Sequence, residues 1–246
     1  MLDAPTCTPS PSLDSGRGVD EFVPSLPTIQ AERILRIQGY ADLQRIRPAI
    51  RRSAESMALQ APTLCEPRVA FRRVPIIDLS GGALALHGNV RLNCDAFGQV
   101  LAGCDEIAVF VLTVGPRLDA RVVDLTEDGE LLDALLLETA GWLCIEDATR
   151  QFKVYLREAA NSKSCRITSR MGPGYSYKVN ARMCVWPLEE QIKLFGLFQG
   201  AKLPVTVMES SAMQPKMSRS GLFGVGPIAR LSAACQDQNS AVGVAP

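Results

Sequence analysis

The segment Arg170–Tyr175, with the sequence RMGPGY, has the residue types most suited to binding chemistry. Its two glycines flank a proline, so the backbone can approach a ligand closely in a shape that the proline ring fixes. Arg170 offers a planar guanidinium for a carboxylate, and Tyr175 offers an aromatic face. The combination suits an amino acid joined to a nucleoside. A tight structural turn with a surface ion pair explains the same residues, and the pattern alone favours that explanation.

The elements around this segment are predicted from their periodicity. Arg166–Ser169 predicts a strand leading into it, and Pro187–Phe198 predicts a helix after it, with proline at the first helical position. Apolar residues at three- and four-residue intervals predict a long core helix over Asp128–Ala160. The apolar run Ile107–Val114 predicts a buried strand at the centre of a sheet.

The other predicted elements are shorter. They are helices over Ile29–Ile37 and Ala41–Leu59, the second delayed by Pro48, a helix capped by Asp95 that ends at Leu101, and strands over Val69–Leu79, Val90–Asn93 and Val205–Glu209. Helices and strands mix without the regular alternation of a doubly wound sheet, which favours an α+β fold over a parallel α/β fold.

Charge and hydropathy restrict the partners. The 246 residues include 26 Lys plus Arg and 26 Asp plus Glu, so no net charge attracts the chain to nucleic acid or to an anionic membrane. The arginines at 45, 47, 51 and 52 are predicted to form a solvated face. No apolar run approaches the roughly 20 residues of a membrane-spanning helix, and the N-terminus lacks the features of a secretion signal. We therefore expect a cytoplasmic protein whose partner is a small molecule or another protein.

Cysteine and histidine usage argues against a metal site. None of the eight cysteines forms a C-x-x-C pair, and His87 is the only histidine. In a chain without an export signal we expect reduced thiols, many of them buried. A Ser-His-Asp triad would depend on that one histidine, so we predict no metal and assign no catalytic residue.

Several motifs in order resemble one known family. RMGPGY resembles the R-x-x-P-G-Y motif of the activation, or reactivation, domain of cobalamin-dependent methionine synthase, and WPLEEQIKLF resembles the helix that follows it in stand-alone members. Glu209–Pro215, ESSAMQP, resembles the family's E-S-x-A-M-x-P segment, and Ser218–Gly226 resembles the apolar strand after it. The segments ILRIQGY, Leu101–Cys104 and LTVGPRLDARV resemble its earlier parts, so the likeness covers roughly residues 30–228.

The resemblance implies a fold and a domain organisation. We expect a single mixed α+β domain, with a twisted, largely antiparallel sheet flanked by helices, over residues 28–230. A flexible leader at 1–27, rich in proline, and a flexible tail at 231–246 would flank it.

The resemblance also implies that the chain binds S-adenosylmethionine. By motif position, Arg170 would bind the methionyl carboxylate, the backbone at Gly172 and Gly174 would hydrogen-bond the ligand, and Tyr175 would line the pocket.

Other positions are implied less directly. Phe223, with Leu222, matches a strand where the family places a ligand-contacting aromatic residue. Glu209 would face the sulfonium or ribose, or would instead stabilise its turn. Glu146 and Asp147 lie where the family carries acidic residues in its long helix.

The reaction implied is reductive methylation, in which an oxidised cobalamin takes one electron and receives the methyl group of S-adenosylmethionine. Cobalamin would be carried by a partner, a cobalamin-binding methyltransferase module, and a flavodoxin-like protein would donate the electron. The alternatives are a non-enzymatic docking module or chaperone for a corrinoid protein, and a nucleotide-binding glycine loop. The segment Ser176–Val185 departs from the family pattern and is expected to reshape the pocket.

Overall fold

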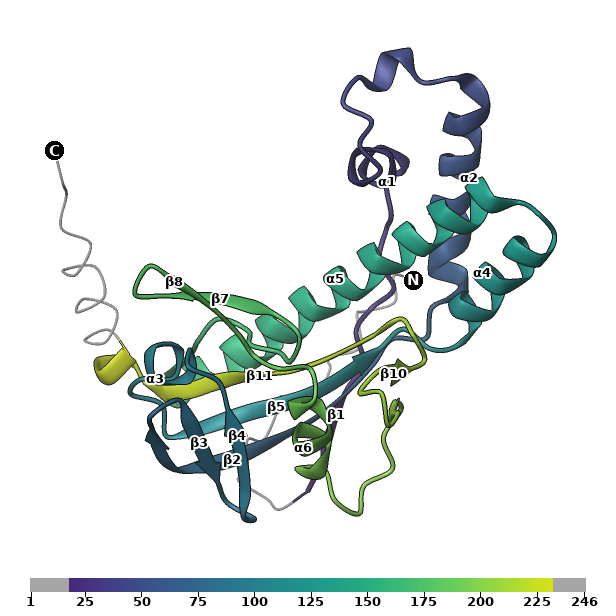
Figure 1. Ribbon diagram of the computed structural model, residues 1–246. Helices are drawn as coiled ribbons and strands as arrows, with labels where there is room; N and C mark the ends of the chain where they lie inside the picture. The colour runs from purple at the N-terminus through teal and green to yellow at the C-terminus, as the bar shows by residue number, and fades with distance from the viewer. Residues whose placement is uncertain (1–17, 232–246) are drawn as a thin grey trace, which may run out of the picture.

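A seven-stranded antiparallel sheet organises the molecule, which the computed structural model describes over residues 18–231 (Figure 1). Its strands lie in the order β4 (Val90–Asn93), β3 (Ala83–Leu86), β2 (Arg68–Ser80), β5 (Glu106–Thr113), β11 (Ser218–Pro227) and β6 (Cys165–Ile167), and β1 (Asp20–Phe22) pairs with β2. Every neighbouring pair is antiparallel. The α+β fold and the antiparallel sheet predicted above are confirmed.

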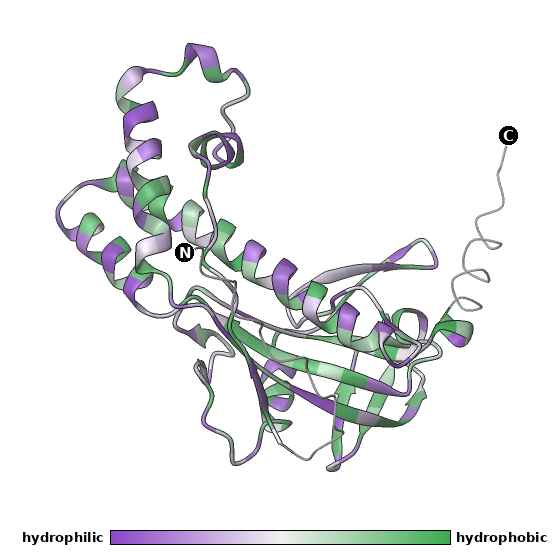
Figure 2. Ribbon diagram, turned by 180° about the vertical axis from the view of Figure 1, so that it is seen from behind, coloured by the Kyte–Doolittle hydropathy of each residue, from purple (hydrophilic) through white to green (hydrophobic). Residues whose placement is uncertain are grey.

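Strand β5 lies between β2 and β11 and is buried on both faces, as predicted. Side chains of a strand alternate between the two faces of its sheet. Ala108, Phe110 and Leu112 enter one hydrophobic core, and Ile107, Val109 and Val111 enter a second. The central strands are mainly hydrophobic in Figure 2. The sheet therefore separates two cores.

Helices cover the first core. The 31-residue helix α5 (Leu131–Asn161) lies across this face, and α1 (Ala31–Ile37), α2 (Pro48–Leu64) and α4 (Arg117–Glu127) gather at its N-terminal end (Figure 1). Phe152 of α5 is fully buried, with ring centroids 5.2 Å from Phe71 and 5.3 Å from Phe110. This aromatic cluster holds α5 on the sheet.

Shorter elements cover the second core. They are α3 (Phe97–Val100), α6 (Glu190–Gly196), the hairpin of β7 (Ser176–Val179) and β8 (Arg182–Val185), and the small pair of β9 (Thr206–Val207) and β10 (Met213–Gln214). Trp186, which follows the hairpin, is fully buried and makes an edge contact with Phe97, with centroids 4.9 Å apart.

The structure corrects several expected elements. Helix α4 was not predicted, because its first residues were considered only as part of the segment LTVGPRLDARV. The hairpin β7–β8 was not predicted either. The N-cap of α3 is Ala96, so Asp95 does not cap it, because the helix begins one residue later than expected. The predicted helix over 41–59 is a short 3-10 turn over Leu43–Arg45 followed by α2, which begins at Pro48.

The domain limits are only partly within the described residues. Strand β1 lies inside the expected leader of 1–27. Its pairing with β2 makes Asp20, Glu21 and Phe22 part of the sheet. Residues 1–17 and 232–246, which include most of the expected leader and nearly all of the expected tail, lie outside the described residues.

Within residues 18–231, no helix is both long and apolar enough to cross a bilayer. The same residues contain no group of three or more His, Cys, Asp or Glu side chains placed to hold a metal ion. The six cysteines at positions 65, 94, 104, 144, 165 and 184 are free thiols.

The aromatic cluster gives a test of this packing. Phe152→Ala should lower the free energy of unfolding by about 3–5 kcal/mol, because it removes a fully buried ring from between α5 and the sheet. Urea denaturation followed by circular dichroism measures the change. Arg157→Ala, at an exposed position of the same helix, is the matched control and should change stability little. An equal loss in both variants would contradict this account.

Candidate functional site

The segment Arg170–Tyr175 continues β6 along the edge of β11. Met171 N–H donates to the Leu222 carbonyl at 2.9 Å, and Leu222 N–H donates back to the Met171 carbonyl at 2.8 Å. Just before it, Thr168 N–H donates to the Gly224 carbonyl at 2.9 Å. These bonds anchor the segment on a central strand, which is a rigid support for a binding loop.

Both glycines of the segment are required by its geometry. A Cβ atom at Gly172 would lie 2.9 Å from the Ser220 carbonyl oxygen and 3.0 Å from Arg170 Nη1. Gly174 has φ of +81°, a left-handed conformation that favours glycine. Its N–H donates to the Trp186 carbonyl at 2.8 Å, so the turn closes against the end of the β7–β8 hairpin.

Tyr177 of the hairpin holds the turn from the other side. Its hydroxyl accepts from Gly172 N–H at 2.7 Å and donates to the Gly172 carbonyl at 3.0 Å. Burial raises the pKa of this hydroxyl, which keeps it protonated and able to donate. Sequence reasoning missed this residue because it treated the segment Ser176–Val185 as a departure from a pattern. The alternating SYKV, then Asn180 and Ala181, then RMCV were the available signal for a hairpin with a two-residue turn.

Arg170 carries the strongest binding feature of the site. Its guanidinium carbon lies 4.4 Å from the centroid of the Tyr175 ring, a cation–π arrangement. Its Nη1 is buried and has no hydrogen-bond partner within the described part of the chain. A buried donor of a charged group without a partner costs about 1–3 kcal/mol or more, and buried polar groups of this kind are rare in folded proteins. The Nη1 donor of Arg170 is therefore buried and without a partner, although the residue as a whole is only half-buried.

A second arginine lies on the α5 side of β11. Arg219 is 4% exposed; its Nη2 pairs with Glu146 Oε1 of α5, and its Nη1 donates to Thr149 Oγ1 at 3.0 Å. The hydrogen bond from Arg219 lowers the pKa of the Glu146 carboxyl, and the charges of Arg219, Arg170 and Arg33 lower it further. Three guanidinium groups thus favour the charged form of this carboxylate.

The remaining predicted residues are placed apart from this group. Glu209 is exposed, in the turn between β9 and β10. Phe223 is fully buried on the α5 face of the sheet, 5.5 Å from Phe110 between ring centroids. Leu222 is buried in the opposite core, and Asp147 pairs with Arg150 of its own helix. The structure brings together Arg170, Gly172, Gly174 and Tyr175, and Glu146 of α5 is paired with Arg219.

Gln191 connects the segment Glu209–Pro215 to β11. Ser220 Oγ donates to Gln191 Oε1 at 2.9 Å, and Gln191 Nε2 donates to the Ser211 carbonyl at 2.7 Å. Gln191 is 2% exposed, so both ends of its buried amide are satisfied. Two of the motifs identified in the sequence are therefore joined by one side chain that supports the strand beneath the loop.

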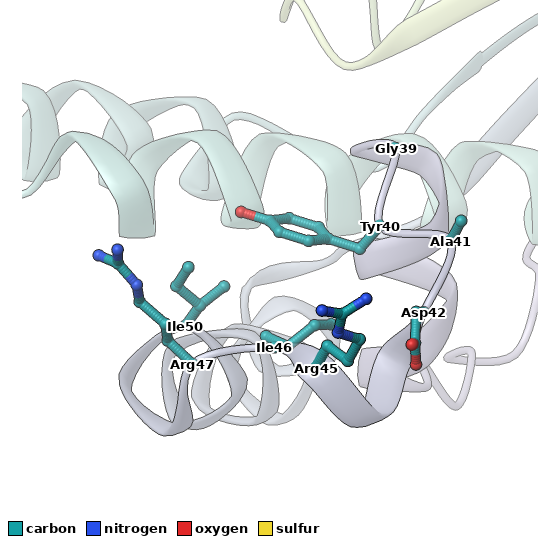
Figure 3. Close-up of a pocket in the computed structure, with 8 residues that line it drawn as sticks. All are labelled: Gly39, Tyr40, Ala41, Asp42, Arg45, Ile46, Arg47 and Ile50. Atoms are coloured by element: carbon teal, nitrogen blue, oxygen red, sulfur yellow. The ribbon is translucent and has the colours of Figure 1, made fainter.

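Two cavities lie away from Arg170. One of about 450 Å³ lies between the end of α1 and the start of α2, where the ring of Tyr40 faces Arg45 and Ile46 (Figure 3). Another of about 440 Å³ is lined by α4, α5 and the β9–β10 segment, including Asp119 and Met213. Arg45 is exposed, as predicted for a solvated face. Arg170, whose buried Nη1 has no hydrogen-bond partner, lines neither of these two cavities.

The Glu146 carboxyl gives a pH-dependent test. Its pKa is lower in the folded chain, so its contribution to stability is present above its ordinary value of 4.5 and is lost as the pH falls through the lower folded value. Glu146→Gln should therefore be less stable than wild type at neutral pH, and the difference should narrow below pH 4.5. Urea denaturation over a pH series that runs from neutral to acidic and passes through 4.5 measures the difference. Glu158→Gln, exposed on the same helix, is the control, and a difference that does not change with pH would exclude the ion pair as its cause.

Comparisons with known proteins give one informative likeness. No family model and no curated protein matches the chain. Among solved structures, the chain is similar to the crystal structure of the MetH reactivation domain bound to AdoHcy, with a TM-score of 0.56 and 14% sequence identity. The match covers 97% of this chain and 90% of that one. The chain therefore shares the fold of the MetH reactivation domain over nearly its full length.

Proposed function

We propose that the chain binds S-adenosylmethionine at the segment Arg170–Tyr175 and acts as a reactivation protein. It would support the reductive methylation of cobalamin carried by a partner corrinoid methyltransferase, such as a methionine synthase whose modules are separate chains. The observation that carries the proposal is the buried, unpaired Nη1 of Arg170, held over the Tyr175 ring. The shared fold supports it, because that neighbour is bound to AdoHcy.

The charge of the site suits the amino-acid end of the ligand. A carboxylate beside Arg170 would satisfy its free donor with a charge-assisted hydrogen bond, which is roughly twice as strong as a neutral one. The nearby Glu146 is engaged by Arg219 and leaves Arg170 available. The Tyr175 side chain, 38% exposed, offers an apolar face at the same place.

Gly172 and Gly174 contribute space rather than donors. Gly172 N–H already donates to Tyr177 and Gly174 N–H to Trp186, so neither is free for a ligand without a rearrangement. The Gly172 carbonyl also accepts from the Tyr177 hydroxyl and, at 3.4 Å, from Tyr175 N–H, so the expected backbone hydrogen bonds to the ligand would need the Gly174 carbonyl or a rearrangement of the turn. Glu209 and Phe223 receive no role in the proposal, because one is exposed in a distant turn and the other is buried in the core.

The proposed reaction makes modest demands on this chain. Cobalamin on the partner, with one electron from a flavodoxin-like donor, would supply a strong nucleophile, and the sulfonium of the methyl donor is a good leaving group. The residues of this chain then need to bind and orient the methyl donor and exclude water, without a general base. No residue is assigned a catalytic role.

Calorimetric titration with S-adenosylmethionine tests the proposal directly. Wild type should bind saturably, and Arg170→Ala should weaken binding by about 1.5–3 kcal/mol, the loss of a hydrogen bond to a charged group. Arg166→Ala removes an exposed arginine from β6 and is the matched control, which should bind as wild type does. ATP serves as the control ligand, because it has the nucleoside without the methionyl group.

Other outcomes would change the proposal. Equal weakening by Arg166→Ala and Arg170→Ala would indicate a general loss of positive charge rather than a site at Arg170. Tighter binding of ATP would favour a nucleotide site. If the folded chain, with a corrinoid partner present, binds no S-adenosylmethionine, the proposal fails and a docking module is the better account.

A further inference from the structure

The cavity of about 440 Å³ between α4, α5 and the β9–β10 segment has the lining of a ligand site. Its volume falls within the range of small-molecule sites, roughly 300–1,000 Å³, and such sites combine apolar walls with a few polar groups. Two of its apolar side chains, Val123 and Met208, are half-exposed. The apolar lining consists of Val122, Val123, Met208, Met213 and Met217.

The walls of the cavity come from a helix and from a methionine-rich segment. On α4, Asp119, Val122 and Val123 are spaced by three and four residues and therefore share one face of the helix. The methionines have unbranched thioether side chains, which adapt to the shape of a ligand. The backbone of their segment is held by Met208 N–H, which donates to the Ala212 carbonyl at 2.8 Å. A helical wall and an adaptable wall thus form the cavity together.

Asp119 is the acidic group of the helical wall. Its Oδ2 accepts from the N–H groups of Lys216 and Met217, at 2.5 Å and 3.3 Å. Its Oδ1 is buried and has no hydrogen-bond partner among residues 18–231. Burial raises the pKa of the carboxyl and the nearby Glu138 carboxylate raises it further, whereas the two N–H groups and the Lys216 charge lower it. One carboxylate oxygen is thus left without the donor that buried polar groups normally have.

The charged side chains that line the cavity leave one negative charge. They are Asp119, Glu138 and Lys216. Lys216 Nζ pairs with Glu138 Oε1, which neutralises that carboxylate. Asp119 is bound by two backbone N–H groups, which carry no net charge. Because buried charges are normally paired, the cavity is matched by a ligand with a single positive charge.

We propose that this cavity binds a small organic cation, an amine with an apolar body, whose ammonium group lies at Asp119. The hydrocarbon body would contact the valines and methionines, and the ammonium would supply the donor that Oδ1 lacks. The terminal torsion of an aspartate has a broad minimum, so a small rotation presents Oδ1 to the cavity. This site is distinct from the segment Arg170–Tyr175, and the inference does not rest on the proposed function.

An inorganic cation fits the same lining less well. Ca²⁺ and Mg²⁺ take about six or more oxygen ligands. Over residues 18–231 no three His, Cys, Asp or Glu side chains are placed to hold a metal ion. Most of the lining is hydrocarbon and thioether, which a hydrated ion would leave in contact with water and an alkyl amine would cover. The lining therefore favours an organic cation.

Titration with n-hexylamine, observed by NMR at the methionine methyl groups, tests the proposal. The amine is protonated at neutral pH, as a lysine side chain is. Of the seven methionines, Met208, Met213 and Met217 line the cavity, whereas Met171 belongs to the loop at Arg170. Hexylamine should shift the three cavity signals saturably and leave the Met171 signal unchanged. 1-Hexanol and hexanoate, which have the same chain length without the positive charge, should bind about tenfold more weakly or less.

Two variants of the cavity and one control complete the test. Asp119→Asn removes the charge but keeps an oxygen for the two backbone N–H groups, and it should weaken hexylamine binding about tenfold or more. Met208→Lys places a positive charge at a half-exposed lining position, so it should weaken binding without loss of the fold. Asp124→Asn, at an exposed position of α4 outside the cavity, should bind as wild type does.

Several results would overturn the proposal. They are equal binding of hexylamine and 1-hexanol, a saturable shift at Met171 instead of at the cavity methionines, no saturable shift at all, and unchanged affinity in folded Asp119→Asn. The proposed function is tested separately, because S-adenosylmethionine is expected at Arg170. Hexylamine binding in a chain that binds no S-adenosylmethionine would overturn only the proposed function.

Discussion

The candidate site depends on β11 and on how closely other groups approach its backbone. On one edge β11 pairs with β5, and on the other it carries β6 and the Met171 bridge that anchors the loop. A Cβ atom at Gly221 would lie 2.3 Å from the Met171 carbonyl oxygen, and one at Gly224 would lie 2.5 Å from Cys104 Sγ. The glycines let backbone and side chains pack directly on the strand. A side chain at Gly221 would therefore displace the backbone of the loop at Met171, and one at Gly224 would displace Cys104.

The alternation of β11 distributes its side chains between two tasks. Arg219 and Phe223 face α5, where one pairs with Glu146 and the other joins the aromatic cluster. Ser220 and Leu222 face the opposite core, where Ser220 bonds Gln191. A buried charge such as Arg219 is stable only when it is paired and hydrogen-bonded. Because its partners Glu146 and Thr149 both belong to α5, these bonds fix the position of α5 relative to the strand. The long helix and the loop are therefore held in register by the same strand.

Elements with strong periodicity were predictable from the sequence, and contacts between distant residues were not. The apolar run of β5 and the three- and four-residue spacing in α5 depend on local pattern, and both were predicted. Helix α4 was missed because its short stretch carries many charges and follows a Gly-Pro turn. The loop at Arg170 was identified from its own residues. The pairing of Arg219 with Glu146 joins residues 73 positions apart, and no local pattern shows which arginine is paired and which is left free.

The position of Phe223 shows how strand register limits inference from a motif. A shift of one residue along a strand moves a side chain to the other face of the sheet. The side chain of Met171 enters the same core as Leu222, whereas the charge of Arg170, the preceding residue, lowers the pKa of the Glu146 carboxyl of α5, the helix that covers the face of Arg219 and Phe223. That face is already filled by Phe110 and Phe152 at Phe223, and position 221 between Arg219 and Phe223 is a glycine. The strand therefore offers no exposed aromatic side chain beside Arg170, and the aromatic surface available to a ligand there must come from Tyr175 in the loop itself.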